Sequence, residues 1–218
     1  LECDRESAFG GVLLLNRKIT IDLAKKISQS FFELIIAPEY DLKSLDILKL
    51  KKNLIILKNK NIKKNKKEFR STIFGTLYQE TDKTKIDKKF VRLVTNKKTT
   101  KSMLDDLIFS LKVSKHLKSN AIVLSRNKQT VGLSCGQTSR IEAVKLAIKK
   151  MNANFKINKV VCASDGFFPF TDSVQLLNKS NCKVIAQPAG SVNDRKVINY
   201  SIKNQLSLYF CKNRLFKH

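Results

Sequence analysis

The fold class is decided by residues 121–151, which read AIVLSRNKQTVGLSCGQTSRIEAVKLAIKKM. Two apolar and β-branched runs, 121–124 and 130–134, are separated by a short polar segment, which predicts a β-hairpin. The run 140–151 predicts a helix, because apolar residues recur along one face of it. That face carries Ile141, Val144, Ile148 and Met151.

A capping box marks the start of this helix, since Ser139 can accept a hydrogen bond from the first turn and Glu142 can return one.

Similar patterns of strands and helices fill the rest of the chain. Strands are predicted at residues 11–15, 34–37, 54–57, 69–79, 91–95, 160–163, 183–187 and 206–210. Helices are predicted at 20–31, 44–52, 100–117, 171–177 and 194–204. The alternation predicts an α/β fold with mostly parallel strands and helices on both faces of the sheet.

The composition describes a globular and strongly cationic chain. Of 218 residues, 42% are hydrophobic, and Lys+Arg 43 against Asp+Glu 18 give a net charge of +25. Such a charge attracts polyanions, so nucleic acids and anionic substrates both stay open beside a merely solvated lysine-rich surface. The densest basic cluster comprises Lys58, Lys60, Lys63, Lys64, Lys66 and Lys67. It has no aromatic residue before Phe69, so it lacks the base-stacking part of a nucleic-acid groove, and a nucleic-acid partner is not favoured.

Cysteine usage and apolar runs limit the compartment and the kind of site. The five cysteines are Cys3, Cys135, Cys162, Cys182 and Cys211. They form no CxxC pair and are accompanied by only two histidines, so no zinc site of familiar spacing is predicted. No apolar run approaches the ~18 residues of a membrane span, and the first residues do not resemble a signal peptide. We expect a cytoplasmic protein with buried free thiols, no membrane and no metal.

Two loops that follow predicted strands carry polar chemistry, in the position where open α/β sheets bind ligands. Residues 135–140 place Gly136 and Arg140 at a helix start, which suits an anion; an ordinary connection with a surface arginine fits equally. Residues 164–172 put three phenylalanines around a proline. They form either a slot for a heteroaromatic ring that donates to Asp172, or a hydrophobic plug with Asp172 as the cap of the next helix.

A third loop and the carboxyl terminus add further candidates. Residues 187–194 offer backbone amides and Ser191 to a carbonyl or phosphate, although Asp194 could simply cap a helix. Residues 214–218 concentrate cations beside Phe216, in a position where tails are commonly frayed.

Seven segments together carry a resemblance to a known family. They are SAFGG at 7–11, ELIIAP at 33–38, KSNAIV at 118–123, GQTSR at 136–140, ASDGFFPFTD at 163–172, QPAGS at 187–191 and RLFKH at 214–218. In this order and spacing they resemble the AICAR transformylase domain of the bifunctional purine-biosynthesis family that also carries an IMP cyclohydrolase domain. The resemblance implies formyl transfer from 10-formyltetrahydrofolate to the amine of AICAR, on the route to IMP, without a metal. It also implies a homodimer with shared active sites.

The same resemblance implies an architecture and a set of site residues. Two cytidine-deaminase-like three-layer α/β/α subdomains are expected at residues 1–99 and 100–218, the first truncated at its N-terminus. The residues expected to contact AICAR are Gly10, Glu33, Asn120, Arg140, Arg214 and Phe216. Those expected on the folate side are Ile141, Phe167, Asp172, Ser191 and Val192. Asn120 would orient the carboxamide end of the nucleotide.

The chain departs from the family in its catalytic pair. The family places a Lys-His pair in a KHANPCG-like stretch just before the SAFGG segment, and no such stretch occurs among the 218 residues. We expect Lys115 and His116 to be surface residues outside the site, and His218 not to be the base. Thr171 and Ala189 stand where the family commonly has arginine and glycine. The expectation is a C-terminal fragment that is nearly inactive alone and exposes an apolar sheet edge, causing aggregation or dependence on a dimer. The alternatives are a lysine-rich nucleic-acid-binding domain and a ligand-binding pseudoenzyme.

Overall fold

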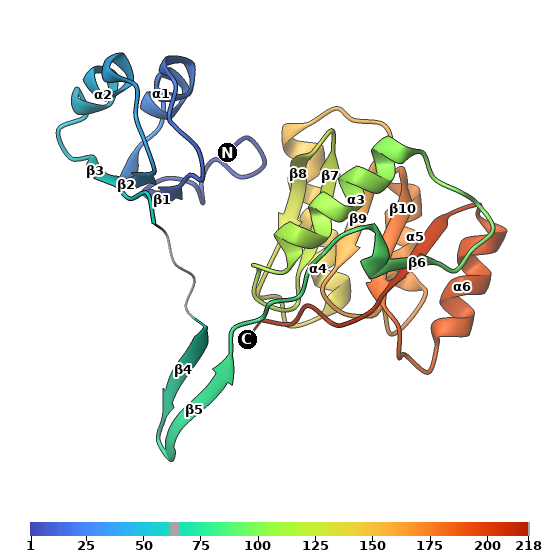
Figure 1. Ribbon diagram of the computed structural model, residues 1–218. Coiled ribbons are helices and arrows are strands. Elements are labelled where there is room, and N and C mark those ends of the chain that lie inside the picture. The colour runs from blue at the N-terminus through green and yellow to red at the C-terminus, as the bar shows by residue number, and fades with distance from the viewer. Residues whose placement is uncertain (62–65, 218) are drawn as a thin grey trace. The chain divides into compact units, whose positions relative to one another are not determined.

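A computed structural model describes residues 1–61 and 66–217, so Lys63 and Lys64 of the basic cluster and His218 lie outside the described residues. The chain forms two compact units, the first built mainly from Cys3–Lys83 and the second mainly from Thr84–His218 (Figure 1). Residues 84–99 belong with the second unit because Val91–Leu93 (β6) pairs with Ser207–Cys211 (β11) of its sheet. The boundary between the compact units therefore precedes the subdomain boundary that the sequence predicts at 99.

The first unit contains a parallel three-stranded sheet in the order β1-β2-β3. Its elements are β1 (Gly11–Leu14), α1 (Ile21–Ser28), β2 (Phe32–Ala37), α2 (Leu42–Lys49) and β3 (Ile55–Lys58). Both helices pack on one face, around a core that includes Ile27, Ile35 and Leu48. Helix α1 ends before the predicted residue 31, because Phe32 already belongs to the next strand.

The opposite face of this sheet is apolar and exposed. Two rows of side chains lie in register across the three strands, and together they are Val12, Leu34, Ile55, Leu14, Ile36 and Leu57. The outer residues Val12, Leu14 and Ile55 are 61%, 59% and 57% exposed. Parallel sheets are ordinarily covered on both faces. The described part of the first unit thus has two layers, and it exposes an apolar sheet face where the sequence predicted an exposed sheet edge.

Residues 67–80 of the first unit form a hairpin, so the prediction of a single strand over 69–79 is wrong. Strand β4 (Lys67–Thr72) pairs antiparallel with β5 (Gly75–Glu80) across a turn at Ile73 and Phe74. Gly75 has φ +134°, a conformation that other residues rarely adopt, and this permits the reversal. Thr72 Oγ1 donates to Gly75 O at 2.9 Å and closes the turn.

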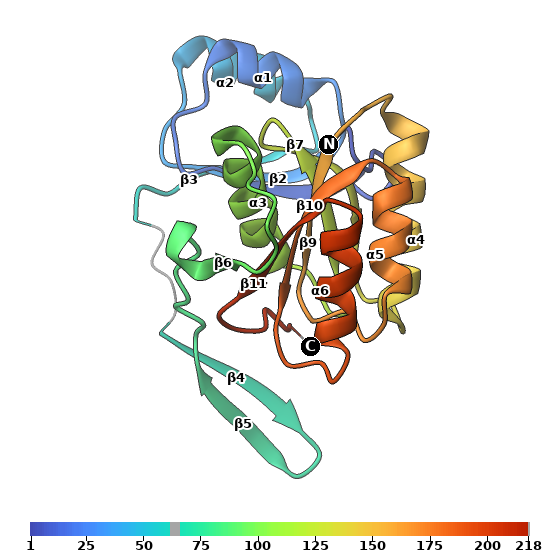
Figure 2. The same ribbon diagram turned by 90° about the vertical axis from the view of Figure 1, so that its right-hand side faces the viewer.

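The second unit is a three-layer α/β/α structure around a six-stranded sheet in the order β6-β11-β10-β9-β7-β8. Its remaining elements are η1 (Lys88–Phe90), α3 (Lys101–Ser114), β7 (Ile122–Arg126), β8 (Gln129–Ser134), α4 (Arg140–Asn154), β9 (Val160–Ser164), α5 (Asp172–Lys179), β10 (Cys182–Pro188), α6 (Asp194–Lys203) and β11 (Ser207–Cys211). Helix α3 covers one face, and α4, α5 and α6 cover the other (Figure 2).

The second sheet is mixed, so the prediction of mostly parallel pairing holds for the first unit only. Strands β9, β10 and β11 are parallel, whereas β7 is antiparallel to β9, and β6 and β8 are antiparallel edge strands. The predicted hairpin between β7 and β8 is confirmed. Asn127 and Lys128 form its two-residue turn with φ 52° and 55°, as the twist of a tight hairpin requires. The Asp106 carboxylate accepts hydrogen bonds from both of their N–H groups, at 2.9 and 2.7 Å.

Within the described residues, no helix is long and apolar enough to cross a bilayer. Over the same part of the chain, no three histidine, cysteine or carboxylate side chains gather as a metal site would need.

Candidate functional site

Five connecting segments of the second unit meet at one edge of its sheet. The parallel strands β9, β10 and β11 all end there. Strand β7 begins there and β8 ends there, because Ile122 lies opposite both Ser164 and Ser134. The antiparallel placement of β7 therefore brings residues 118–121 and 135–139 to the loops after β9 and β10.

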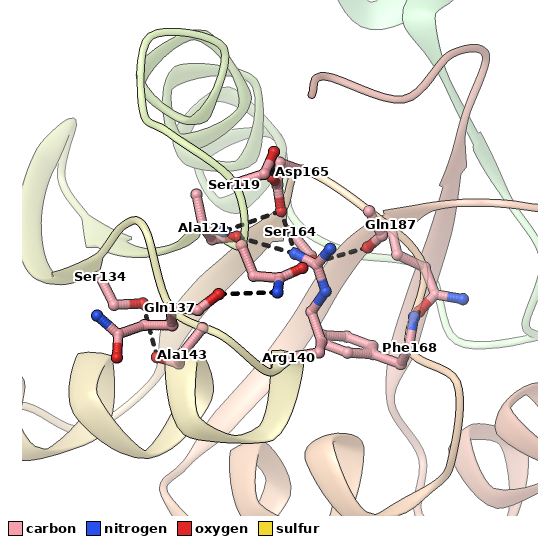
Figure 3. A network of polar contacts seen from close by, with 12 residues as sticks. Ser119, Ala121, Ser134, Gln137, Arg140, Ala143, Ser164, Asp165, Phe168 and Gln187 are labelled. Carbon is pink, nitrogen blue, oxygen red and sulfur yellow. Dashed lines mark hydrogen bonds and ion pairs between the residues drawn. The ribbon is translucent and has the colours of Figure 1, made fainter. Parts of the chain in front are cut away.

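Asp165 is the centre of the polar network at this edge (Figure 3). Its side chain has no exposed surface. The carboxylate accepts hydrogen bonds from Ser119 Oγ at 2.5 Å and from the backbone N–H of Ala121 at 3.0 Å, and it forms an ion pair with Arg140. A buried carboxylate is tolerated when it is paired and hydrogen-bonded in this way. Asp165 therefore joins the β7 entrance, helix α4 and the loop after β9.

Arg140 is buried, with 8% of its surface exposed, so the alternative of a surface arginine is wrong. Besides the ion pair, its Nη1 donates to Ser164 Oγ at 3.3 Å. The residue sits at the first position of α4, where Ser139 Oγ accepts from the N–H of Glu142 at 3.3 Å. The predicted Ser139 cap is thus confirmed. The Glu142 side chain, which the predicted capping box would turn back to Ser139, accepts instead from Lys145 Nζ at 2.7 Å.

The carboxyl-terminal tail is held against the same network. Leu215 donates its N–H to Asp165 O at 2.9 Å, and Ser119 donates its N–H to Lys217 O at the same distance. Lys217 N–H in turn donates to Ser119 Oγ at 3.3 Å. Leu215 is buried, so the tail is anchored through residue 217 rather than frayed.

Two aromatic rings flank the guanidinium of Arg214. Its Cζ lies 5.0 Å from the Phe167 ring centroid and 5.6 Å from that of Phe216, within the range of cation–π contact. Gly166 lies between this group and Arg140: a Cβ there would approach the Arg140 guanidinium and come within 2.6 Å of the Phe216 ring. The structure therefore brings Arg140, Phe167, Arg214 and Phe216 to one place.

The sequence left two roles open for the three phenylalanines of the loop after β9, a slot for a heteroaromatic ring and a hydrophobic plug. The structure gives them different positions. Phe168 is fully buried in the core, and its N–H donates to Gln187 Oε1 at 2.9 Å. Phe167 is half-buried beside Arg214, and Phe170 is exposed. Asp172 is not the helix cap: α5 begins with Asp172 itself, after Thr171.

The loop after β10 lies against the loop after β9 and against the carboxyl-terminal tail. Asn193 Nδ2 donates to Pro169 O at 2.8 Å, and a Cβ on Gly190 would lie 3.8 Å from Arg214. Ser191 Oγ accepts from the N–H of Asn193 at 3.2 Å. The alternative that Asp194 caps α6 is wrong, because its carboxylate instead accepts from Gly190 N–H at 2.7 Å.

The remaining predicted residues occupy varied positions. Asn120 Nδ2 donates to Gln137 O at 2.9 Å, and Ile141 is half-buried in the first turn of α4. Asp172 and Val192 are exposed. Gly10 and Glu33 lie in the first unit, where Gly10 has φ +70° and a Cβ there would stand 3.9 Å from the Glu33 carboxylate.

The Lys115 and His116 pair lies at the end of α3. His116 is exposed, as predicted, but Lys115 is half-buried and its Nζ donates to Thr84 O at 3.1 Å. The lysine therefore anchors residue 84 beside the helix.

Three residues that organise the site were not predicted from the sequence: Ser119, Asp165 and Gln187. Asp165 had a usable signal, because it is a carboxylate close behind the apolar run 160–163 and beside a glycine. Ser119 and Gln187 lie in the KSNAIV and QPAGS segments, but no local pattern indicated what their side chains do, since each acts on a residue distant in sequence.

Cys135 is the exposed thiol of the loop before α4, and the other four cysteines are buried. Burial raises the pKa of Cys211 to about 12 and that of Cys162 well above its ordinary value. The thiolate is the reactive form. We therefore expect Cys135 to react with Ellman's reagent at least ~100-fold faster than the others in the native protein. Cys135→Ser should abolish the fast phase, and a second fast thiol would contradict the packing.

Comparison with known proteins finds a matching family and similar proteins for this chain. A family profile described as AICARFT/IMPCHase bienzyme matches residues 1–150. A Bifunctional purine biosynthesis protein PurH from Bacteroides thetaiotaomicron is 43% identical over 216 residues, which cover 99% of this chain and 43% of that protein. Its namesake from Buchnera aphidicola is 44% identical over 221 residues, covering 99% and 42%. The chain thus spans less than half the length of these relatives. Because the profile covers more than half of the chain, the chain belongs to the AICARFT/IMPCHase bienzyme family.

Proposed function

We propose that this chain supplies ligand-binding surface for formyl transfer from 10-formyltetrahydrofolate to the amine of AICAR, on the route to IMP in the cytoplasm. The observation that carries the proposal is the meeting of Arg140, Arg214, Phe167 and Phe216 around Gly166. Two guanidinium groups beside two aromatic rings suit an anionic ligand that contains a flat heterocycle. The relatives' name, a bifunctional purine biosynthesis protein, supports a purine precursor as that ligand.

On the nucleotide side, Arg214 is the exposed cation and Arg140 the buried one. Arg140 Nη1 is occupied by Asp165, so the rest of its guanidinium remains for a ligand oxygen. The Asn120 amide already donates to Gln137 O, which leaves its oxygen to accept from the carboxamide of AICAR. Phe216 would pack against the nucleotide, and Gly10 and Glu33 stay proposed AICAR contacts.

On the folate side, we propose that the half-buried Phe167 packs against the pterin and that Asp172 accepts hydrogen bonds from its nitrogens. Ile141, Ser191 and Val192 would complete this side. The loops that carry them are joined by the Asn193 to Pro169 bond. The chemistry requires no metal, and each unit would correspond to a cytidine-deaminase-like subdomain.

The residues that move the proton are a separate part of the proposal. In the family's reaction a histidine removes the proton of the weakly nucleophilic amine, and such general-base help is worth about 10² to 10⁴ in rate. The 218 residues contain no KHANPCG-like stretch, so we expect them to bind the ligands but to turn over very slowly. We propose that the working form is a dimer with shared active sites.

Calorimetric titration with AICAR tests the assignment. Arg214→Ala should weaken binding about 10-fold, because it removes a charge-assisted hydrogen-bond donor held between two rings. Arg92→Ala, an exposed arginine on β6, serves as the matched control and should leave the affinity unchanged. Absence of AICAR affinity, with tight nucleic-acid binding that falls steeply with salt, would instead support the nucleic-acid alternative.

A hybrid chain separates a working enzyme from a pseudoenzyme. Fusing a segment with the KHANPCG-like Lys-His stretch that the family resemblance implies ahead of residue 1 should give formyl transfer. Binding of both ligands by the hybrid with no transfer would favour the pseudoenzyme.

A further inference from the structure

The carboxyl-terminal tail presents two residues of the candidate site by alternation. Leu215 is buried in the core under α3, whereas Arg214 and Phe216 on either side of it are exposed. Successive side chains of an extended segment point to opposite sides, so the burial of Leu215 turns its neighbours away from the core. On that side Arg214 meets the Phe167 ring. The position of the tail backbone therefore decides whether the Arg214 guanidinium stands in the site.

Ser119 binds this tail backbone through both its N–H and its hydroxyl. The N–H donates to Lys217 O at 2.9 Å, and Oγ accepts from Lys217 N–H at 3.3 Å. The same Oγ donates its single proton to Asp165 Oδ2 at 2.5 Å, and the two side chains lie side by side in Figure 3. An ionised carboxylate only accepts, so the direction of both hydroxyl hydrogen bonds is fixed. The Ser119 hydroxyl thus links the Asp165 carboxylate to the tail.

The segment that carries Ser119 is fixed by contacts that do not involve the hydroxyl. Asn120 N–H donates to Gln137 O at 3.2 Å, and Gln137 N–H donates back to Asn120 O at 3.4 Å. Gly136 N–H donates to Lys118 O at 2.8 Å. Removal of the hydroxyl therefore leaves this segment in place and acts on the tail.

Asp165 is the common reference for the two arginines of the site. Its carboxylate forms the ion pair with Arg140, and its backbone O accepts from Leu215 N–H at 2.9 Å. Arg140 is thus held by Asp165 directly, whereas Arg214 is held through the tail. A ligand that contacts both guanidinium groups needs the tail in a defined position relative to Asp165, and the Ser119 hydroxyl contributes to that position.

We propose that Ser119 is a positioning residue for AICAR binding, whose hydroxyl sets the tail relative to Asp165 and so holds Arg214 and Phe216 in the site. Ser119 acts through the tail and needs no contact with the ligand. The inference deepens the proposed function and rests on it for the identity of the ligand.

Amide hydrogen exchange of the full chain, without ligand, tests the link to the tail. Leu215 N–H is the reporter, because its acceptor is Asp165 O and not Ser119. Ser119→Ala should speed this exchange about 10-fold, since the lost hydrogen bond favours local opening. Ser119→Thr, which keeps a hydroxyl, should restore the wild-type rate, and Ser102→Ala, at an exposed serine on α3, should not change it. An unchanged rate in Ser119→Ala would overturn the proposal.

Lys217→Pro tests the same link from the tail side. Proline has no N–H, so this change removes the bond to Ser119 Oγ and leaves the bond from Ser119 to Asp165 in place. Leu215 N–H should again exchange about 10-fold faster. The test therefore does not depend on the folding of Ser119→Ala, and a wild-type rate in Lys217→Pro would refute the link.

A double-mutant cycle, followed by calorimetric titration with AICAR, separates positioning from a merely structural role. Ser119→Ala should weaken AICAR binding about 5-fold in the wild-type chain. In a chain that carries Arg214→Ala with Phe216→Ala the effect should be less than about 2-fold, because the side chains through which Ser119 acts are gone. Equal effects in the two backgrounds would contradict the positioning role.

The two measurements keep the inference apart from the proposed function. A wild-type chain without AICAR affinity would overturn the proposed function and, with it, the role of Ser119 in AICAR binding. AICAR affinity together with an unchanged Leu215 exchange rate in Ser119→Ala would overturn the inference alone.

Discussion

Replacing Asp165 with alanine should lower the free energy of unfolding of the second unit by about 3–5 kcal/mol. The change leaves the buried Arg140 guanidinium without its counter-charge and removes the acceptor of Ser119 Oγ and Ala121 N–H. Breaking a buried ion pair from one side is costly because the remaining charge stays desolvated. Urea denaturation followed by far-ultraviolet circular dichroism measures the effect.

Asp172→Ala is the matched control for that prediction. Asp172 is the first residue of α5, after the same loop, and it is exposed. Its carboxylate accepts from the adjacent Ser173 N–H at 2.6 Å. Its replacement should change stability by less than about 1 kcal/mol. Equal destabilisation by the two variants would contradict the central role of Asp165. Arg140→Met combined with Asp165→Leu should recover part of the loss, since an apolar pair leaves no buried charge.

Replacing Gly132 with valine should destabilise the second unit by about 3 kcal/mol or more. Gly132 lies on β8 under helix α4, and even a Cβ there would come within 3.0 Å of the backbone oxygen of Ala147 and meet Met151. A backbone carbonyl of a helix cannot rotate away as a side chain can, so the whole helix would have to move off the sheet. Thermal unfolding should show a lower Tm, and AICAR affinity should fall because Arg140 begins the same helix.

Gly136→Ala provides the comparison for Gly132. A Cβ on Gly136 would meet nothing within 4 Å, so space is not the obstacle there. The φ of +65° is the obstacle, because it would strain an alanine at this position. The expected loss is about 1 kcal/mol, the usual cost of a left-handed conformation in a residue other than glycine. If Gly132→Val were no more harmful than Gly136→Ala, helix α4 would not lie against β8 as described.

Local signals in the sequence were sufficient wherever neighbouring residues satisfy one another. The Ser139 cap, the hairpin between β7 and β8, and the alternation of strands and helices all follow from contacts within a few residues. The turn at Ile73 and Phe74 was missed because both of its residues are apolar and β-forming. Gly75 is the single turn-forming glycine between residues 69 and 79. The family was also identified from the sequence, because the seven short segments that carry the resemblance can be read without the structure.

What the amino-acid sequence determined by itself is the α/β class, the strand and helix succession and which loops carry polar groups, because those properties depend on periodicity and capping. Which of these groups meet was decided by tertiary structure. Strand β7 runs antiparallel to β9 and thereby delivers Ser119, and with it the β8 loop leading to Arg140, to the edge that also holds Asp165. Strand order is fixed by long-range packing energy, which no local pattern encodes, so a buried carboxylate 25 residues from its arginine became visible only in the folded chain.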